Sequence, residues 1–301
     1  MNWHKASCMA EERAWQGKTD GTSWMHRGLI KLMRVIPLRL MYALVSVFVL
    51  PFYLLFSKGT KPMYHFFRQR LGYAPAKACW GVCRNFHRFS QVILDKFYMF
   101  SGGKLEFVVE NRDLYENLAK QEAGFLILSA HIGNYEVAGY TLKATNKRYN
   151  ALVFAGEGEA VMQNRQKMFD GTNIHMILVK SDFSHIFAIE SALNNGESVS
   201  IPSDRVVENQ KTVACDFFGA PAKFPLGPFA LAAQRDVAVL SIHVMKQSAR
   251  QYHIFVKQLD SKGDSVRERA SQYARQFANH VESIVRQYPE QWFNYYEFWQ
   301  T

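Results

Sequence analysis

The spacing of apolar residues divides the chain into a helical part and a part in which strands and helices alternate. Between Tyr64 and Phe100, apolar and aromatic residues recur at steps of three and four, the period of one face of an α-helix. After Gly102 and Gly103 the pattern changes to short apolar runs separated by turn residues and helical stretches. We therefore expect a helical region followed by an α/β domain.

The apolar runs and the helical stretches place the elements of this domain. Strands are expected at residues 105–109, 125–128, 151–154, 174–179, 198–201, 237–244 and 252–259. Helices are expected up to residue 119 after the first strand, and at residues 159–169, 184–193 and 265–286. Such alternation predicts a mixed or largely parallel sheet covered by helices.

An uncharged apolar run, Leu40 to Ser57, precedes these elements. A membrane-spanning helix needs ~20 apolar residues, and Pro51 is expected to kink this one. Basic residues stand on both sides of the run, so the positive-inside rule favours neither orientation. A buried helix of a soluble domain is the ordinary alternative, but this uncharged apolar run is longer than those that such helices usually contain. We interpret it as a membrane anchor that either crosses once or dips in from the cytoplasmic face.

The predicted fold class is therefore α/β, with a mixed sheet flanked by helices and preceded by an N-terminal membrane-associated helix. Composition agrees, because 48% of the 301 residues are hydrophobic, which excludes wholesale disorder. The net charge is +10, but no helix-turn-helix, zinc finger or RNP motif is present, so no nucleic-acid partner is expected. An anionic membrane surface, a phosphorylated lipid or an acidic carrier protein fits this charge better.

The stretch Gly124–Gly139 carries the candidate chemistry. Phe125 to Leu128 reads as a buried strand, Gly133 and Asn134 end it, and Asn134 is a good N-cap for a helix that runs through Glu136 towards Leu142. His131 then lies at the corner between strand and helix. Catalytic sites of open α/β sheets collect at such carboxyl ends of strands.

His131 and Glu136 form a candidate general base and its orienting group. Because Gly133 allows a tight turn, the imidazole can fold back onto the carboxylate, which would hold one tautomer and stabilise the imidazolium. The ordinary alternative is a core histidine beside a first-turn acid. The ten histidines and four cysteines show no metal-ligand pattern, so no metal is expected.

The segment His131-Ile-Gly-Asn-Tyr-Glu136 resembles the H-x4-D/E motif of the glycerolipid and lysophospholipid acyltransferase superfamily. Its Glu form, followed by Val-Ala-Gly, is similar to the late acyltransferases of lipid A biosynthesis. Phe217–Phe229 and Tyr288–Trp299, which contains the P-x-Q-W block, resemble the same family. The resemblance divides the chain into a polar lead-in (1–28), a membrane-anchor helix region (29–58) and an acyltransferase domain (59–301).

The resemblance also implies roles for residues outside the His131 motif. Arg165 corresponds to an arginine that faces the family's site, where it would bind an anion or a developing oxyanion. Asp204 corresponds to an aspartate of the third family block, and it would position Arg165 or contact the acceptor, unless it only caps a turn. Either Arg165 or backbone N–H groups near Gly133 and Asn134 would stabilise the tetrahedral oxyanion.

The phenylalanine-rich stretch has an implied role in binding the acyl chain. The family resemblance suggests that this stretch helps to form the acyl-chain channel, with Gly227 and Pro228 opening the next helix. The channel residues expected from it are Phe218, Phe224, Gly227 and Pro228. By itself the stretch would read only as a well-packed loop.

The function implied is that of a membrane-bound O-acyltransferase. It would move a fatty acyl group from acyl carrier protein, or from coenzyme A, to a hydroxyl of a lipid A precursor or a related anionic glycolipid, without a further cofactor. It would work at the inner membrane with its active site on the cytoplasmic face. Two alternatives stay open: a different acceptor, such as a lysophospholipid, an amino-acid lipid or a polyene lipid, and a non-catalytic protein that binds lipid or carrier protein.

Overall fold

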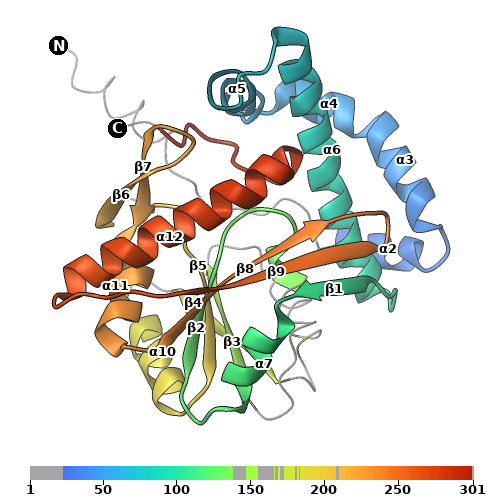
Figure 1. The fold of residues 1–301 in the computed structure, drawn as a ribbon. Helices are drawn as coiled ribbons and strands as arrows, with labels where there is room; N and C mark the ends of the chain where they lie inside the picture. Colours follow the sequence, from blue (N-terminus) through green and yellow to red (C-terminus); the bar gives the residue numbers. More distant parts are fainter. Residues whose placement is uncertain are drawn as a thin grey trace, which may run out of the picture.

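Seven strands form one mixed sheet in the computed structural model of the chain (Figure 1). The structure describes residues 23–137, 147–154, 173–179, 184–207 and 210–299, together with residues 166, 169 and 182. The strands, in the order β1-β9-β8-β2-β5-β3-β4, are Glu106–Glu110, Gln251–Leu259, Ala238–Lys246, Phe125–Ser129, Ser198–Pro202, Tyr149–Phe154 and Ile174–Val179. Only β8 and β9 pair antiparallel in this sheet.

Helices cover both faces of the sheet, and further helices precede its first strand in the sequence. They are α2 Ser23–Met33, α3 Leu38–Phe48, α4 Leu50–Phe56, α5 Thr60–His65, the π-helix η1 Phe66–Arg70, α6 Pro75–Phe100, α7 Arg112–Lys120, the 3-10 turn η2 Tyr135–Val137, α10 Ser184–Asn194, α11 Leu226–Arg235, α12 Val266–Gln287 and the 3-10 turn η3 Pro289–Gln291. The predicted α/β class with a mixed, helix-flanked sheet is confirmed.

The sequence missed a small antiparallel hairpin. Its strands are β6, Thr212–Asp216, and β7, Pro221–Pro225. Because β7 begins and ends with proline, the stretch reads as a turn-rich loop. The helix expected at residues 159–169 lies almost wholly outside the described residues. Of the helix expected to follow Asn134, the described part is the short turn η2.

The apolar run that precedes the domain is broken, as Pro51 predicts. α3 and α4 meet at Val49 with a bend of 41°, and Pro51 lies in the first turn of α4. Within the described residues, no single helix has the length and apolar composition of a membrane span, whereas this bent pair taken together meets both criteria.

Two apolar clusters hold the sheet between its helices. Alternate residues of each strand point to opposite faces, so Leu126 and Leu128 pack with α12 on one face, while Phe125 and Ile127 pack with Tyr115 of α7 on the other. α12 begins at the N-cap Ser265, whose hydroxyl accepts a hydrogen bond from the Glu268 amide at 3.2 Å.

A buried ionic network joins the N-terminal helices to the sheet. Asp95 of α6 accepts hydrogen bonds from Lys246 of β8, Tyr252 of β9 and Tyr42 of α3. The side chains of Asp95 and Lys246 are wholly inaccessible to solvent. Burial raises the pKa of Asp95 and lowers the pKa of Lys246, while their mutual attraction opposes both shifts. α3 is therefore attached to the α/β domain by charged groups as well as by apolar packing.

Candidate active site

Two neighbouring parallel strands bring His131 and Asp204 together. β2 pairs with β5 in a register that sets Ser129 opposite Pro202. His131 follows Ser129 by two residues, and Asp204 follows Pro202 by two. Both residues therefore lie at the same edge of the sheet, two positions beyond the ends of their strands. The amide of Ser203 donates to the Ser129 carbonyl at 2.8 Å, and this bond holds the ends of β2 and β5 side by side.

Asp204 fixes His131 at two atoms. Nδ1 of the imidazole lies 2.7 Å from Oδ1 of Asp204, and the His131 amide donates to Oδ2 at 2.8 Å. Burial by itself would raise the pKa of Asp204, but the charge and the hydrogen bonds of His131 outweigh it, so the pKa lies below its ordinary value. An ionised carboxylate only accepts hydrogen bonds, so when the imidazole is neutral its proton sits on Nδ1 and Nε2 carries the lone pair.

The loop after His131 is held by β8 and by the segment after α12. Gly133 has φ +54°, and a Cβ atom there would lie 2.0 Å from the Val244 carbonyl oxygen, so only glycine fits. The Gly133 amide donates to the Gln291 carbonyl at 2.8 Å, and the Asn134 amide donates to the Val244 carbonyl at 2.7 Å. Both amides are thus engaged within the fold, which corrects the expectation that they face a substrate oxygen.

Asn134 and Gln291 tie this loop to the buried ionic network. The Asn134 side-chain amide donates to the Tyr252 hydroxyl at 3.3 Å. The Gln291 side chain bonds both backbone groups of Lys246, at 2.8 and 2.9 Å. Trp292, next to Gln291, is buried in the core, and its neighbour across an isolated antiparallel β-bridge is Ile132. The P-x-Q-W block therefore supports the His131 loop, a role that the sequence did not reveal.

Two residues predicted for the site cannot be placed. The backbone of Glu136 belongs to the turn η2, but its side chain lies outside what the structure describes. Arg165 also lies outside the described residues. Their roles as orienting carboxylate and anion-binding group stay predictions. Asp204, predicted to position Arg165 or contact the acceptor, is the carboxylate that the structure places at Nδ1 of His131.

A largely apolar cavity of about 620 Å³ opens beside His131. Apolar side chains of β3, β4, β5, α10 and α11 form most of its described wall, and His131, Ser129 and Arg205 stand at the strand ends. Its volume falls within the ~300–1,000 Å³ that is usual for small-molecule sites. The cavity can therefore hold a long apolar group whose end reaches the imidazole.

Pro202 explains why the sheet leaves room for this cavity. The Ser198 amide donates to the Arg148 carbonyl at 3.0 Å, so the donors from β5 to β3 are alternate residues, 198, 200 and 202. Proline at 202 has no N–H, and the pairing of β5 with β3 ends at Ser200 opposite Ala151. β3 continues along β4 to Phe154. The cavity lies where β3 and β5 separate.

The channel residues expected from the sequence divide into two groups. Gly227 and Pro228, in the first turn of α11, line the cavity. Phe218 and Phe224 are buried among aromatic rings that include Trp292 and Phe298, and they are not among the described residues that line it. Arg205 was not predicted as a site residue, although it follows Asp204 directly. Its guanidinium donates to the Phe293 carbonyl at 3.1 Å and lines the cavity.

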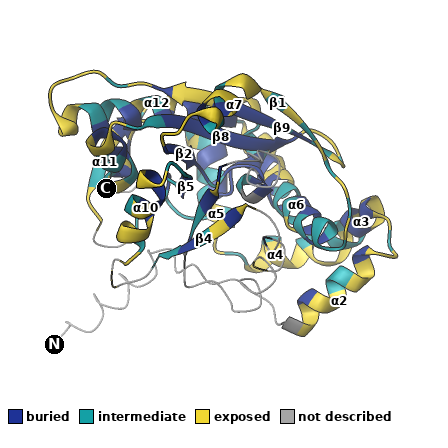
Figure 2. Cartoon of the chain, turned by 90° about the horizontal axis from the view of Figure 1, so that it is seen from below, coloured by how far each residue is buried: buried dark blue, intermediate teal, exposed yellow. Residues whose placement is uncertain are grey.

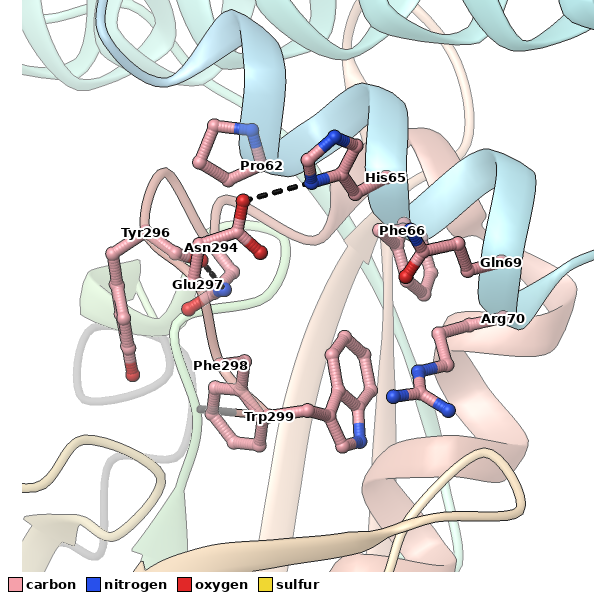
Figure 3. A pocket seen from close by; sticks show the side chains of 10 residues that line it. All are labelled: Pro62, His65, Phe66, Gln69, Arg70, Asn294, Tyr296, Glu297, Phe298 and Trp299. Carbon is pink, nitrogen blue, oxygen red and sulfur yellow. Dashed lines mark hydrogen bonds and ion pairs between the residues drawn. The ribbon is translucent and has the colours of Figure 1, made fainter. Parts of the chain in front are cut away.

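A second cavity, of about 180 Å³, lies between η1 and the segment Asn294–Trp299 (Figure 3). His65 points towards Glu297, with Nδ1 2.9 Å from the carboxylate, and Arg70 lies 4.5 Å from the centre of the Trp299 ring. No described residue lines both cavities. The smaller cavity is thus separate from His131, and the larger one is the candidate active site. The described residues include no cluster of three or more potential metal ligands.

Comparison with known proteins supports the resemblance read from the motifs. A family model described as "Bacterial lipid A biosynthesis acyltransferase" matches residues 82–301. Among solved structures, the 1-acyl-sn-glycerophosphate (LPA) acyltransferase PlsC from Thermotoga maritima is similar, with 14% identity and a TM-score of 0.40. That similarity covers 82% of this chain and 98% of the other. No curated protein matches the chain.

Proposed function

Because the chain belongs to the bacterial lipid A biosynthesis acyltransferase family, we propose that it transfers a fatty acyl group from a thioester to a hydroxyl of a lipid A precursor or a related glycolipid. The donor would be acyl carrier protein or coenzyme A. The observation that carries this proposal is the His131–Asp204 pair, whose imidazole lines a large apolar cavity. The cavity suits an acyl chain, and the pair suits the activation of a hydroxyl.

The reaction requires a base and does not require an acyl-enzyme. Nε2 of His131 would take the proton of the acceptor hydroxyl as its oxygen attacks the thioester carbonyl carbon. The tetrahedral intermediate then expels the thiolate, which takes the proton back from the imidazolium. Asp204 would hold the imidazole in place and stabilise its positive charge. Arg205, which lines the same cavity, would supply a positive charge to stabilise the oxyanion.

We further propose that the reaction takes place at the inner membrane, with the site on the cytoplasmic face. The acyl acceptor is a membrane lipid under this proposal, and a carrier-protein thioester is made in the cytoplasm. The partners are then acyl carrier protein and an anionic glycolipid, and no nucleic acid is involved. The apolar helices α3 and α4 support a membrane location.

A transfer assay tests this function. Purified full-length protein in detergent receives a labelled acyl carrier protein thioester and either a lipid A precursor with a free acyl-chain hydroxyl or a lysophospholipid, and mass spectrometry identifies the products. We expect acylation of the lipid A precursor. Acylation of the lysophospholipid alone would move the protein to the other acceptor class, and an untouched thioester in both reactions would overturn the proposal.

Replacing Asp204 by asparagine should lower kcat by about 100- to 10,000-fold with little change in KM for the thioester. The amide keeps the volume of the carboxylate, but it neither stabilises the imidazolium nor fixes the proton on Nδ1. Steady-state kinetics of the purified variant measure the effect. Asp113→Asn, which removes an exposed carboxylate on α7, is the control and should retain full activity. An unchanged kcat in Asp204→Asn would exclude an orienting role for Asp204.

A further inference from the structure

The helices α2 to α4 carry an unusually apolar outer surface. Phe48, Phe52, Leu55 and Phe56 are exposed, with Leu55 at 79%, and no residue of α4 is buried. Most large apolar side chains that are exposed in the described chain belong to this segment, which lies on one side of the molecule (Figure 2). We call the exposed side chains of these three helices and their links the outer face; they include Trp24, Met25, Leu32, Val35, Leu40, Val47, Phe48, Val49, Phe52, Tyr53, Leu55 and Phe56.

The excess positive charge of the chain lies in the N-terminal part that contains these helices. Residues 21–94 contain 11 Lys and Arg residues and no Asp or Glu, while the rest of the chain contains 25 basic and 26 acidic residues. This segment therefore accounts for the whole net charge. Arg27, Lys31, Arg34, Arg39 and Lys58 are exposed among the apolar side chains. Apolar side chains mixed with basic ones complement a leaflet that contains anionic lipids.

The inner side of α3 is attached to the catalytic domain along the helix. Leu38 and Met41 pack against α6, and the hydroxyl of Tyr42 bonds Asp95 and lies 3.1 Å from Nζ of Lys246. One turn further, the hydroxyl of Ser46 lies 2.8 Å from Nδ1 of His87. A helix that crossed the bilayer would carry these charged and polar groups into hydrocarbon or lose them, and both are costly.

We infer that α2, α3 and α4 lie flat in one anionic leaflet, with the outer face in the lipid and the inner face on the catalytic domain, and that they do not cross the bilayer. The inference rests on the membrane location proposed above and chooses between its two forms. Because of the bend of 41° at Val49, α3 can pack on the catalytic domain while α4 also stays in the plane of the leaflet. Side chains of the outer face would reach ~5–10 Å below the headgroups.

Vesicle flotation tests the partner. His131→Ala protein is mixed with vesicles of phosphatidylglycerol and phosphatidylcholine or of phosphatidylcholine alone. This variant is used so that binding is measured independently of acyl transfer. We expect tighter binding to the anionic vesicles. Combining Leu55→Ser with Phe56→Ser should weaken binding by roughly 100-fold, because each buried side chain contributes about a factor of ten. The matched control combines Phe187→Ser on α10 with Val108→Ser on β1, both exposed and distant from the outer face in sequence.

Depth measurements test the mode of binding. Single cysteines at positions 47, 52 and 56, in a background without other cysteines, carry a fluorophore that brominated lipids quench. One-leaflet binding predicts similar shallow depths for all three, and a cysteine at position 24 that reacts only with reagents on the protein's side of sealed vesicles. A depth at the bilayer centre for position 52, or labelling of position 24 from the opposite side, would overturn the inference.

The outcomes separate this inference from the proposed activity. Shallow binding without any acyl transfer by the parent protein would refute the activity alone. Acyl transfer by a protein whose helices cross the bilayer would refute the one-leaflet arrangement alone. If Leu55→Ser with Phe56→Ser leaves vesicle binding intact but abolishes a dimer, the outer face is an interface between two copies, and the inference is overturned.

Discussion

His131→Ala protein is expected to transfer acyl groups at least ~100-fold more slowly than the parent, since general-base catalysis contributes ~10²–10⁴ in rate. The loss should appear in kcat, because the imidazole acts on the hydroxyl proton in the transition state and contributes little to the binding of the thioester. The assay is the same transfer reaction, run at saturating thioester with products counted by mass. The acyl chain would still bind in the apolar cavity.

The control for this variant is His175→Ala, which removes an exposed histidine from β4. It should keep the activity of the parent. The unfolding midpoint of His131→Ala should be compared with that of the parent, since loss of the imidazole leaves buried Asp204 without one of its partners. A folded His131→Ala protein with near-normal turnover would remove His131 from the mechanism.

The sequence predicted that His131 lies just after the end of a strand, because this signal is local. The run Phe125–Leu128 is fully apolar and ends in turn residues, so the end of the strand, and with it the place of His131, can be read directly. Asp204, the described carboxylate at Nδ1 of His131, could not be read in this way. Glu136 is near in sequence, whereas Asp204 is 73 residues away and arrives only because β5 is the neighbour of β2. Strand order is a property of the whole sheet, and no local pattern encodes it.

The cavity, too, could not be predicted from local sequence patterns. Pro202 is visible in the sequence as the end of a strand, but its effect depends on which strand lies beside it. Only the register of β5 against β3 shows that the missing N–H faces Leu152 and Val153 and opens the sheet there. The hairpin of β6 and β7 was missed for a related reason, since its prolines suit an edge strand and a loop equally well.

Lys246→Met should lower the free energy of unfolding by about 3–5 kcal/mol, the usual cost of leaving one member of a buried ion pair without the other. Asp95 would remain wholly inaccessible to solvent with two tyrosine hydroxyls as its only described partners. Urea unfolding followed by tryptophan fluorescence measures the effect. Lys257→Met, at an exposed position on the neighbouring strand β9, should change the stability by no more than about 0.5 kcal/mol.

The second variant separates charge from packing. In Lys246→Met combined with Asp95→Asn no charge is buried, and asparagine still accepts a hydrogen bond from Tyr42 or Tyr252, so part of the lost stability should return. If the double variant is instead less stable than Lys246→Met, the carboxylate itself holds α3 and β9 together. Because Tyr252 also bonds Asn134 in the loop of His131, the kcat of the folded single variant should fall as well. An unchanged kcat would mean that the network supports the fold without reaching the active site.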